Sequence, residues 1–167
     1  MNIFTMRVNN VDLNKVKPIR GGVIIYTLYN NNIFFGLGID SKTHDITDFG
    51  GGISYKKDKN VILGSIREFN EETLNIFDDI SFEELQECPV IYDNNLLLLF
   101  LRVNINPNDI SNYFLEIYKK TKLKKEVCSI TWFSLDEFIH IIKNSKILFY
   151  KIKNLLNKSK NNYLSLL

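Results

Sequence analysis

Residues 50–52 read Gly50-Gly51-Gly52, and residues 67–72 read Arg67-Glu68-Phe69-Asn70-Glu71-Glu72. Three consecutive glycines mark backbone that turns tightly or approaches a ligand closely. Between about residues 60 and 73 one apolar stripe recurs at helical spacing, which predicts a helix that carries the second motif. The stripe consists of Val61, Ile62, Ser65, Ile66 and Phe69.

Three carboxylates crowd one side of this predicted helix. Glu68 and Glu72 are four residues apart, and Glu71 is three beyond Glu68. Like charges at these spacings repel, so a positive partner is needed among them. A hard divalent cation, Mg²⁺ or Mn²⁺, suits carboxylate oxygens, and the N–H groups of a glycine run can bind an anion. Arg67 can orient a glutamate through a bidentate contact.

The two motifs together resemble the Nudix box, whose pattern is G-x5-E-x7-R-E-U-x-E-E-x-G-U with U apolar. The R-E-U-x-E-E half is complete, but Gly52-x5 leads to Asp58 instead of glutamate, and eight residues instead of seven separate Asp58 from Arg67. Leu74 and Asn75 replace the second glycine of the box and the apolar residue after it. Because asparagine tolerates the left-handed conformation better than leucine, we expect the turn after the helix to be built on Asn75 and not on Leu74.

Strands and helices interleave along the rest of the chain, which predicts a mixed sheet with helices on its faces. A hairpin is expected at 23–39 through Asn30-Asn31-Asn32, because asparagine tolerates positive φ. The other expected strands are 45–49, 88–92, 96–103 and 129–133, and the other helices are 107–120, a helix beginning at the capping box Ser134–Glu137, and 146–158. The segment 129–138, SITWFSLDEF, also resembles a late strand-to-helix segment of the Nudix family. The resemblance spans roughly residues 20–145 and extends to Nudix proteins of large DNA viruses.

The predicted fold class is therefore α/β, a Nudix-type α/β/α sandwich with a mixed sheet in a single domain, residues 1–167. The box region is 51–76, and a basic C-terminal helix covers about 146–160.

The resemblance implies a metal-dependent hydrolase that cleaves the diphosphate linkage of a nucleoside diphosphate linked to a group X. It implies that Glu68, Glu71 and Glu72 bind Mg²⁺ or Mn²⁺, that Glu68 or Glu72 also activates the water, and that Arg67 holds the glutamates in place.

The resemblance also implies roles for residues outside the acidic motif. Gly51 and Gly52 contribute backbone to the substrate site, and Gly52 also to the metal site. Glu126 precedes the strand at 129–133 and is the candidate for an extra catalytic acidic residue from a late loop, which serves as a base or a metal ligand. The other interpretation makes Glu126 a solvated partner of Lys124 or Lys125.

Composition limits the partners. The chain has 167 residues and a net charge of +2, divided into −6 over residues 1–116 and +8 over residues 117–167. A basic C-terminal third can attract a polyanion, so capped RNA, and hence mRNA decapping, stays open beside a small nucleotide substrate. A solvated lysine-rich helix face explains the same charge.

The remaining expectations concern location and activity. The two cysteines cannot form a disulfide scaffold, and the longest apolar run, 96–101, is too short for a membrane helix. We therefore expect a cytoplasmic protein, in the host cytoplasm if viral, without a membrane partner and with a homodimer as an open alternative. The competing hypothesis for function is a non-catalytic Nudix-fold module that binds a nucleotide, RNA or a protein.

Overall fold

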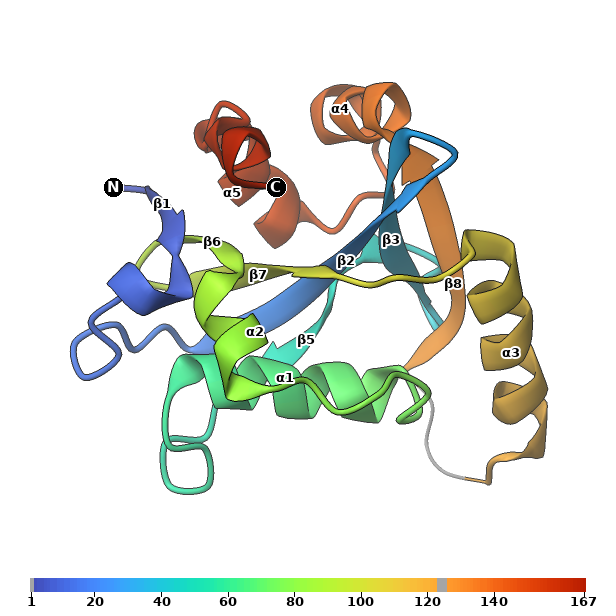
Figure 1. Ribbon diagram of the computed structural model, residues 1–167, viewed down its shortest axis with the longest axis horizontal. Helices are drawn as coiled ribbons and strands as arrows, with labels where there is room; N and C mark the ends of the chain where they lie inside the picture. The colour runs from blue at the N-terminus through green and yellow to red at the C-terminus, as the bar shows by residue number, and fades with distance from the viewer. Residues whose placement is uncertain (1, 123–125) are drawn as a thin grey trace.

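A mixed β-sheet runs through the middle of the molecule (Figure 1). The computed structural model describes residues 2–122 and 126–167, and eight strands in these residues form one sheet. The order β1-β6-β7-β2-β3-β4 is extended by β5, which pairs with β2, and by β8, which pairs with β3. Strands β2 and β7 are parallel, and the other pairs are antiparallel. The strands are β1 (Phe4–Arg7), β2 (Arg20–Tyr29), β3 (Asn32–Asp40), β4 (Ile46–Thr47), β5 (Phe49–Gly52), β6 (Pro89–Tyr92), β7 (Leu96–Arg102) and β8 (Val127–Ser134).

Helices cover both faces of this sheet. In Figure 1, α1 (Val61–Glu72) lies on one side, while α4 (Leu135–Asn144) and α5 (Tyr150–Lys158) lie on the other. Helix α2 (Phe82–Glu87) is on the α1 side, and α3 (Pro107–Lys120) packs beside β8. Short 3₁₀ turns occupy Val8–Asn10 and Asn162–Leu166.

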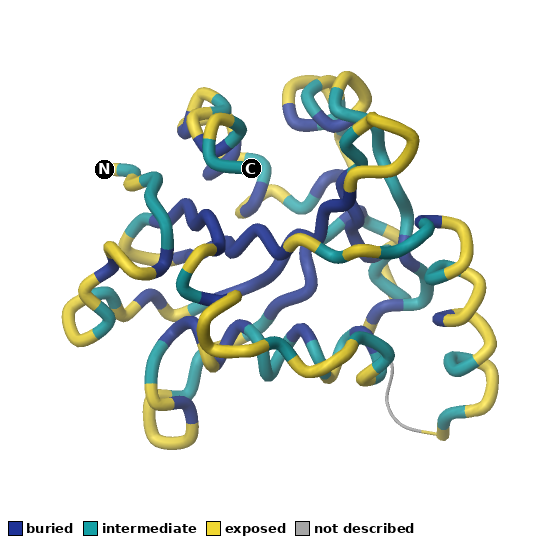
Figure 2. The backbone as a smooth tube through the Cα atoms, in the orientation of Figure 1, coloured by how far each residue is buried: buried dark blue, intermediate teal, exposed yellow. Residues whose placement is uncertain are grey.

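Two buried cores separate these layers, as the dark tube in Figure 2 shows. Along β2 the side chains alternate: Val23 and Ile25 join the core that contains α1, and Ile24 and Tyr26 join the core that contains α4 and α5. The α/β/α sandwich with a mixed sheet is thus confirmed.

Local sequence signals explain several element boundaries. Asn30 and Asn31 have φ of 49° and 62°, so the β2–β3 hairpin turns as expected on residues that tolerate positive φ. The Ser134–Glu137 capping box is present at the start of α4. The side chain of Asn60 accepts a hydrogen bond from the N–H of Leu63 and caps α1.

The prediction that a helix begins at residue 146 is wrong. Leu148 forms a parallel bridge with Ile46, and the backbone of Ile46 exchanges hydrogen bonds with Ile147 and Phe149. This extended pairing delays the helix until Tyr150, and α5 ends at Lys158.

The glycine run does not form the tight turn that we considered. Residues 50–52 lie in β5, and no glycine among the described residues has a positive φ. The glycines instead allow a close approach to the β5 backbone, here by side chains of the acidic site described below.

Leu74 and Asn75, which follow the C-cap residue Thr73 of α1, adopt the left-handed conformation, with φ of 57° and 54°. The expectation that Leu74 avoids this region is therefore wrong. The N–H of Asn75 donates to the carbonyl of Asn70 at 2.8 Å, which closes the helix end, and the Leu74 side chain packs against the α1 core. These contacts hold a conformation that costs leucine about 1–2 kcal/mol.

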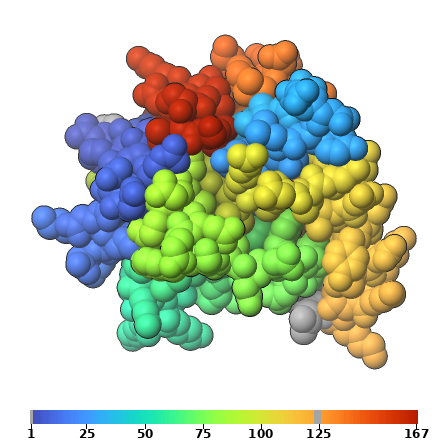
Figure 3. All heavy atoms as spheres, viewed as in Figure 1, coloured from blue at the N-terminus to red at the C-terminus, as the bar shows by residue number. Residues whose placement is uncertain are grey.

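Two further elements are absent from the sequence prediction. Strand β1 and helix α2 were not predicted, although Ser81 and Glu84 form a capping box at the start of α2. The C-terminal segment packs beside the N-terminal strand, as Figure 3 shows at the red and blue ends.

Candidate active site

Helix α1 lies unusually close to strands β2 and β5 because glycines face it. A Cβ atom at Gly21 would lie 2.2 Å from Ser65 Oγ, and one at Gly51 would lie 2.3 Å from Glu68 Oε2. Both distances are far below van der Waals contact. The glycines therefore allow the carboxylate of Glu68 to reach the strand backbone.

Glu72, one turn after Glu68, binds the backbone of the glycine run. Its Oε2 accepts a hydrogen bond from the N–H of Gly50 at 2.7 Å. Burial, together with the nearby carboxylates of Asp48 and Glu126, raises the pKa of Glu72 to about 9, although the Gly50 N–H and Arg20 act to lower it. Glu72 therefore tends to hold a proton unless a positive charge binds beside it.

A buried ion pair lies beside Glu72 and was not predicted from the sequence. Arg20 donates from Nη1 and Nη2 to the two carboxylate oxygens of Asp48, at 2.7 and 2.8 Å, and the Asp48 side chain is fully buried. A Cβ atom would lie 1.7 Å from Asp48 Oδ2 at Gly22 and 2.6 Å from it at Gly50. The only sequence signal for this pair is an acid placed two residues before the glycine run.

Arg67 is fixed from the opposite side by Asp58. Its Nε and Nη2 donate to the two oxygens of Asp58, each at 2.9 Å, and the Asp58 side chain is 5% exposed. Arg67 Nη1 donates to Glu68 Oε1 at 2.7 Å, and Nη2 donates to the carbonyl of Gly52 at 3.2 Å. Arg67 thus orients Glu68, and Asp58, the displaced acid of the box, holds Arg67.

Two predicted residues lie further out. Glu71 is 62% exposed and reaches Arg67 Nη1 at 3.4 Å. Glu126 is exposed, and its backbone carbonyl accepts from the N–H of Ser41 at 2.7 Å, yet its charge acts on Glu72. Its alternative partners, Lys124 and Lys125, lie outside the described residues.

The carboxylates of this site are the candidate ligands of the expected divalent cation. Within residues 2–122 and 126–167, no three His, Cys, Asp or Glu side chains gather at metal-binding distances. The two carboxylates that do reach the glycine strand, Glu68 and Glu72, offer hard oxygen ligands, and the carboxylates of Asp48 and Glu126 near Glu72 also favour a cation. These residues fit Mg²⁺ or Mn²⁺, which typically binds one or two protein carboxylates together with substrate phosphates.

Comparison with solved structures gives the fold class. The chain is similar to an Ap4A hydrolase of C. elegans in a binary complex, with 21% sequence identity, a TM-score of 0.51, and coverage of 87% of this chain and 96% of that chain. A Nudix domain of NrtR from Shewanella oneidensis, solved with ADP-ribose, is 10% identical with a TM-score of 0.46, over 91% of this chain and 94% of that chain. No known family profile and no curated protein sequence matches the chain.

The fold predicted from the motifs, that of the Nudix hydrolases, is therefore confirmed. In the described residues no helix is both long and apolar enough to span a bilayer.

Proposed function

We propose that the chain is a metal-dependent hydrolase that cleaves the diphosphate linkage of a nucleoside diphosphate linked to a group X. The observation that carries this proposal is the position of Glu68 and Glu72 on α1. Both carboxylates lie against the glycine strand β5, one held by Arg67 and the other by the N–H of Gly50.

Each charged group has a role in this proposal. Glu68 and Glu72 hold the divalent cation, with Glu71 and the backbone of Gly52 as further ligands from the outer side. When bound, the cation supplies charge neutralisation for the diphosphate oxygens and the leaving group. Arg67 keeps Glu68 in position. The backbone of Gly51 and Gly52 contacts the substrate.

The attacking water needs a group that accepts its proton. The water oxygen bonds to one phosphorus, and the bond from that phosphorus to the bridging oxygen breaks. A carboxylate of the site, Glu68 or Glu72, takes the proton from the water. Glu126 is the second candidate for this role, and the effect of its charge on Glu72 supports its proximity.

The substrate is a nucleotide derivative, and capped RNA is the alternative within the same reaction. The charge of +8 over residues 117–167 supports an anionic partner of either kind. The free cysteines Cys88 and Cys128 are consistent with the cytoplasmic location that we propose.

Product release is the direct test. Nucleoside triphosphates, ADP-ribose, dinucleoside polyphosphates and cap-labelled RNA are incubated with the protein and Mg²⁺ or Mn²⁺, with Glu72→Gln as the blank. Turnover of any member that the substitution abolishes establishes the hydrolase and identifies X. Release of methylated guanosine diphosphate from RNA alone assigns decapping.

The competing hypothesis is a binding module without turnover. If the protein releases product from no member of the panel, and circular dichroism shows that the protein is folded, the hydrolase hypothesis is contradicted. Retained binding of any panel member by the same sample then assigns the module. Sedimentation of the same sample determines whether the chain forms a homodimer.

A further inference from the structure

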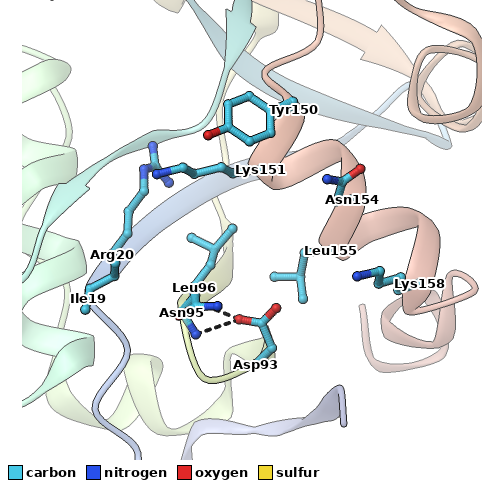
Figure 4. Close-up of a pocket in the computed structure, with 10 residues that line it drawn as sticks. All are labelled: Ile19, Arg20, Asp93, Asn95, Leu96, Tyr150, Lys151, Asn154, Leu155 and Lys158. Carbon is cyan, nitrogen blue, oxygen red and sulfur yellow. Dashed lines mark hydrogen bonds between the residues drawn. The ribbon is translucent and has the colours of Figure 1, made fainter. Parts of the chain in front are cut away.

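A cavity of about 290 Å³ lies between the sheet and the C-terminal helix (Figure 4). Its walls come from Ile19 and Arg20 at the start of β2, from the β6–β7 turn, and from α5.

Basic and hydrogen-bonding side chains line the α5 wall. Lys151, Lys158, Tyr150 and Asn154 all border the cavity, and Figure 4 shows Lys151 and Tyr150 directed toward Arg20. Neither lysine forms an ion pair with a carboxylate in the described part of the chain. The positive end of the α5 dipole lies at its N-terminus, at Tyr150, and no side chain caps this helix.

The single carboxylate in the lining is already engaged. Asp93 Oδ1 accepts hydrogen bonds from the N–H groups of Asn95 and Leu96, at 2.7 and 2.9 Å. It therefore stabilises the β6–β7 turn, and although it keeps its negative charge, it forms no ion pair with either lysine. A ligand that satisfies this cavity carries negative charge.

Arg20 connects the cavity to the acidic site. Its backbone and stem border the cavity, its guanidinium binds Asp48, and the same guanidinium lies 5.3 Å from the centre of the Phe149 ring, directly before α5. Glu72 and Glu68 both act electrostatically on Arg20, which also borders the cavity. A substrate with its diphosphate at Glu68 and Glu72 can therefore extend past Arg20 toward α5.

We propose that this cavity binds phosphate groups of X, and that the enzyme prefers substrates in which X is phosphorylated over those in which X is neutral. This proposal rests on the proposed function for its link to catalysis, but the phosphate site itself does not. Lys151 and Lys158 bind the phosphate oxygens as point charges, with Tyr150 and Asn154 as hydrogen-bond donors.

Direct binding tests the site without turnover. Inorganic tripolyphosphate is titrated calorimetrically into the protein in the presence of EDTA. Because EDTA removes divalent cations, Glu68, Glu71 and Glu72 cannot bind the anion through a metal and repel it. The double substitution Lys151→Ala with Lys158→Ala should weaken binding about tenfold. The control, Lys119→Ala with Lys120→Ala in the last turn of α3, removes the same charge from an exposed surface and should change the affinity less than about twofold.

A matched pair of substrates tests the preference. The lysine double variant should lose about tenfold in kcat/KM on ATP, in which X is a phosphate, and retain its activity on ADP-ribose. A 5′-triphosphorylated RNA oligomer is titrated in the same way. If the RNA binds more tightly than tripolyphosphate, and the lysine double variant no longer binds it, the phosphate that occupies the cavity belongs to RNA.

The outcomes separate the two proposals. If tripolyphosphate fails to bind, or binds both double variants equally, the phosphate site is wrong even where hydrolysis is measured. If no substrate is hydrolysed while tripolyphosphate binding follows the two lysines, the proposed function fails and the site stands. Equal losses on ATP and ADP-ribose contradict the preference for phosphorylated X.

Discussion

Replacing Asp58 by asparagine tests whether the displaced acid of the box holds the active-site arginine. The Asp58 side chain is 5% exposed and accepts from two nitrogens of Arg67 at 2.9 Å. Breaking a fully buried pair costs about 3–5 kcal/mol, and because Arg67 is 33% exposed, water compensates part of that loss. Asparagine keeps the volume and an oxygen for the N–H of Ser54. We therefore expect the free energy of unfolding to fall by about 2–3 kcal/mol.

Urea unfolding at pH 7 measures this difference. The matched control is Asp12→Asn, because Asp12 pairs with Lys15 at 3.6 Å on an exposed surface. Such a pair contributes at most about 1 kcal/mol, so the control should lie close to the native protein. A loss at Asp58 no larger than the loss at Asp12 would refute the inference that this pair holds Arg67.

The pH dependence gives an independent check on the same pair. The guanidinium of Arg67 and the N–H of Ser54 hold the pKa of Asp58 below its ordinary value. A carboxyl group with a lowered pKa in the folded state stabilises the protein above its unfolded pKa of about 3.9, and this contribution disappears as the pH falls through the folded value. The stability difference between the native protein and the Asp58 variant should thus be constant from about pH 5 to 8 and shrink below about pH 4. A difference that widens toward acid pH would contradict the assignment.

Two further predictions concern the acidic motif. Gly51→Ala places a Cβ atom 2.3 Å from Glu68 Oε2, so kcat/KM should fall at least about 100-fold, whereas Gly52→Ala meets no atom within 4 Å and should leave kcat/KM within a few-fold. Steady-state kinetics on the substrate found in the panel compares the pair, and equal effects would disprove the close-approach argument. Glu72→Gln should reduce kcat about 100-fold or more and leave the thermal unfolding midpoint unchanged. Glu71→Gln changes a side chain that is 62% exposed and should reduce kcat less than about tenfold. A larger loss at Glu71 would mean that the exposed carboxylate carries the metal.

The acidic helix could be predicted because its signals are local. The apolar stripe and the spacing of Glu68 and Glu72 depend on neighbours within two turns, and α1 forms at Val61–Glu72 as this pattern predicts. The capping box at Ser134 is equally local. These features need no knowledge of the sheet.

The Arg20–Asp48 pair could not be predicted, because it depends on strand register. These residues are 28 positions apart in sequence and meet because β2 and β5 pair with Gly22 opposite Gly50. Any other register would separate them. Leu74 illustrates the reverse case, in which the local preference of leucine for negative φ is overruled by a helix end and a hydrophobic contact formed elsewhere.

Arg20 lies between the acidic site at Glu72 and the basic cavity beside α5. Arg20 gives both of its terminal nitrogens to Asp48, so little of its charge is left to compensate Glu72. Glu72 stays buried near two other carboxylates, and its pKa stays high. The raised pKa favours a proton on Glu72, and a divalent cation that enters with the ligand can replace this proton; a polyphosphate carries divalent cations with it. The same polyphosphate meets lysines on α5, so the ligand that completes the acidic site is also the ligand that the basic cavity favours.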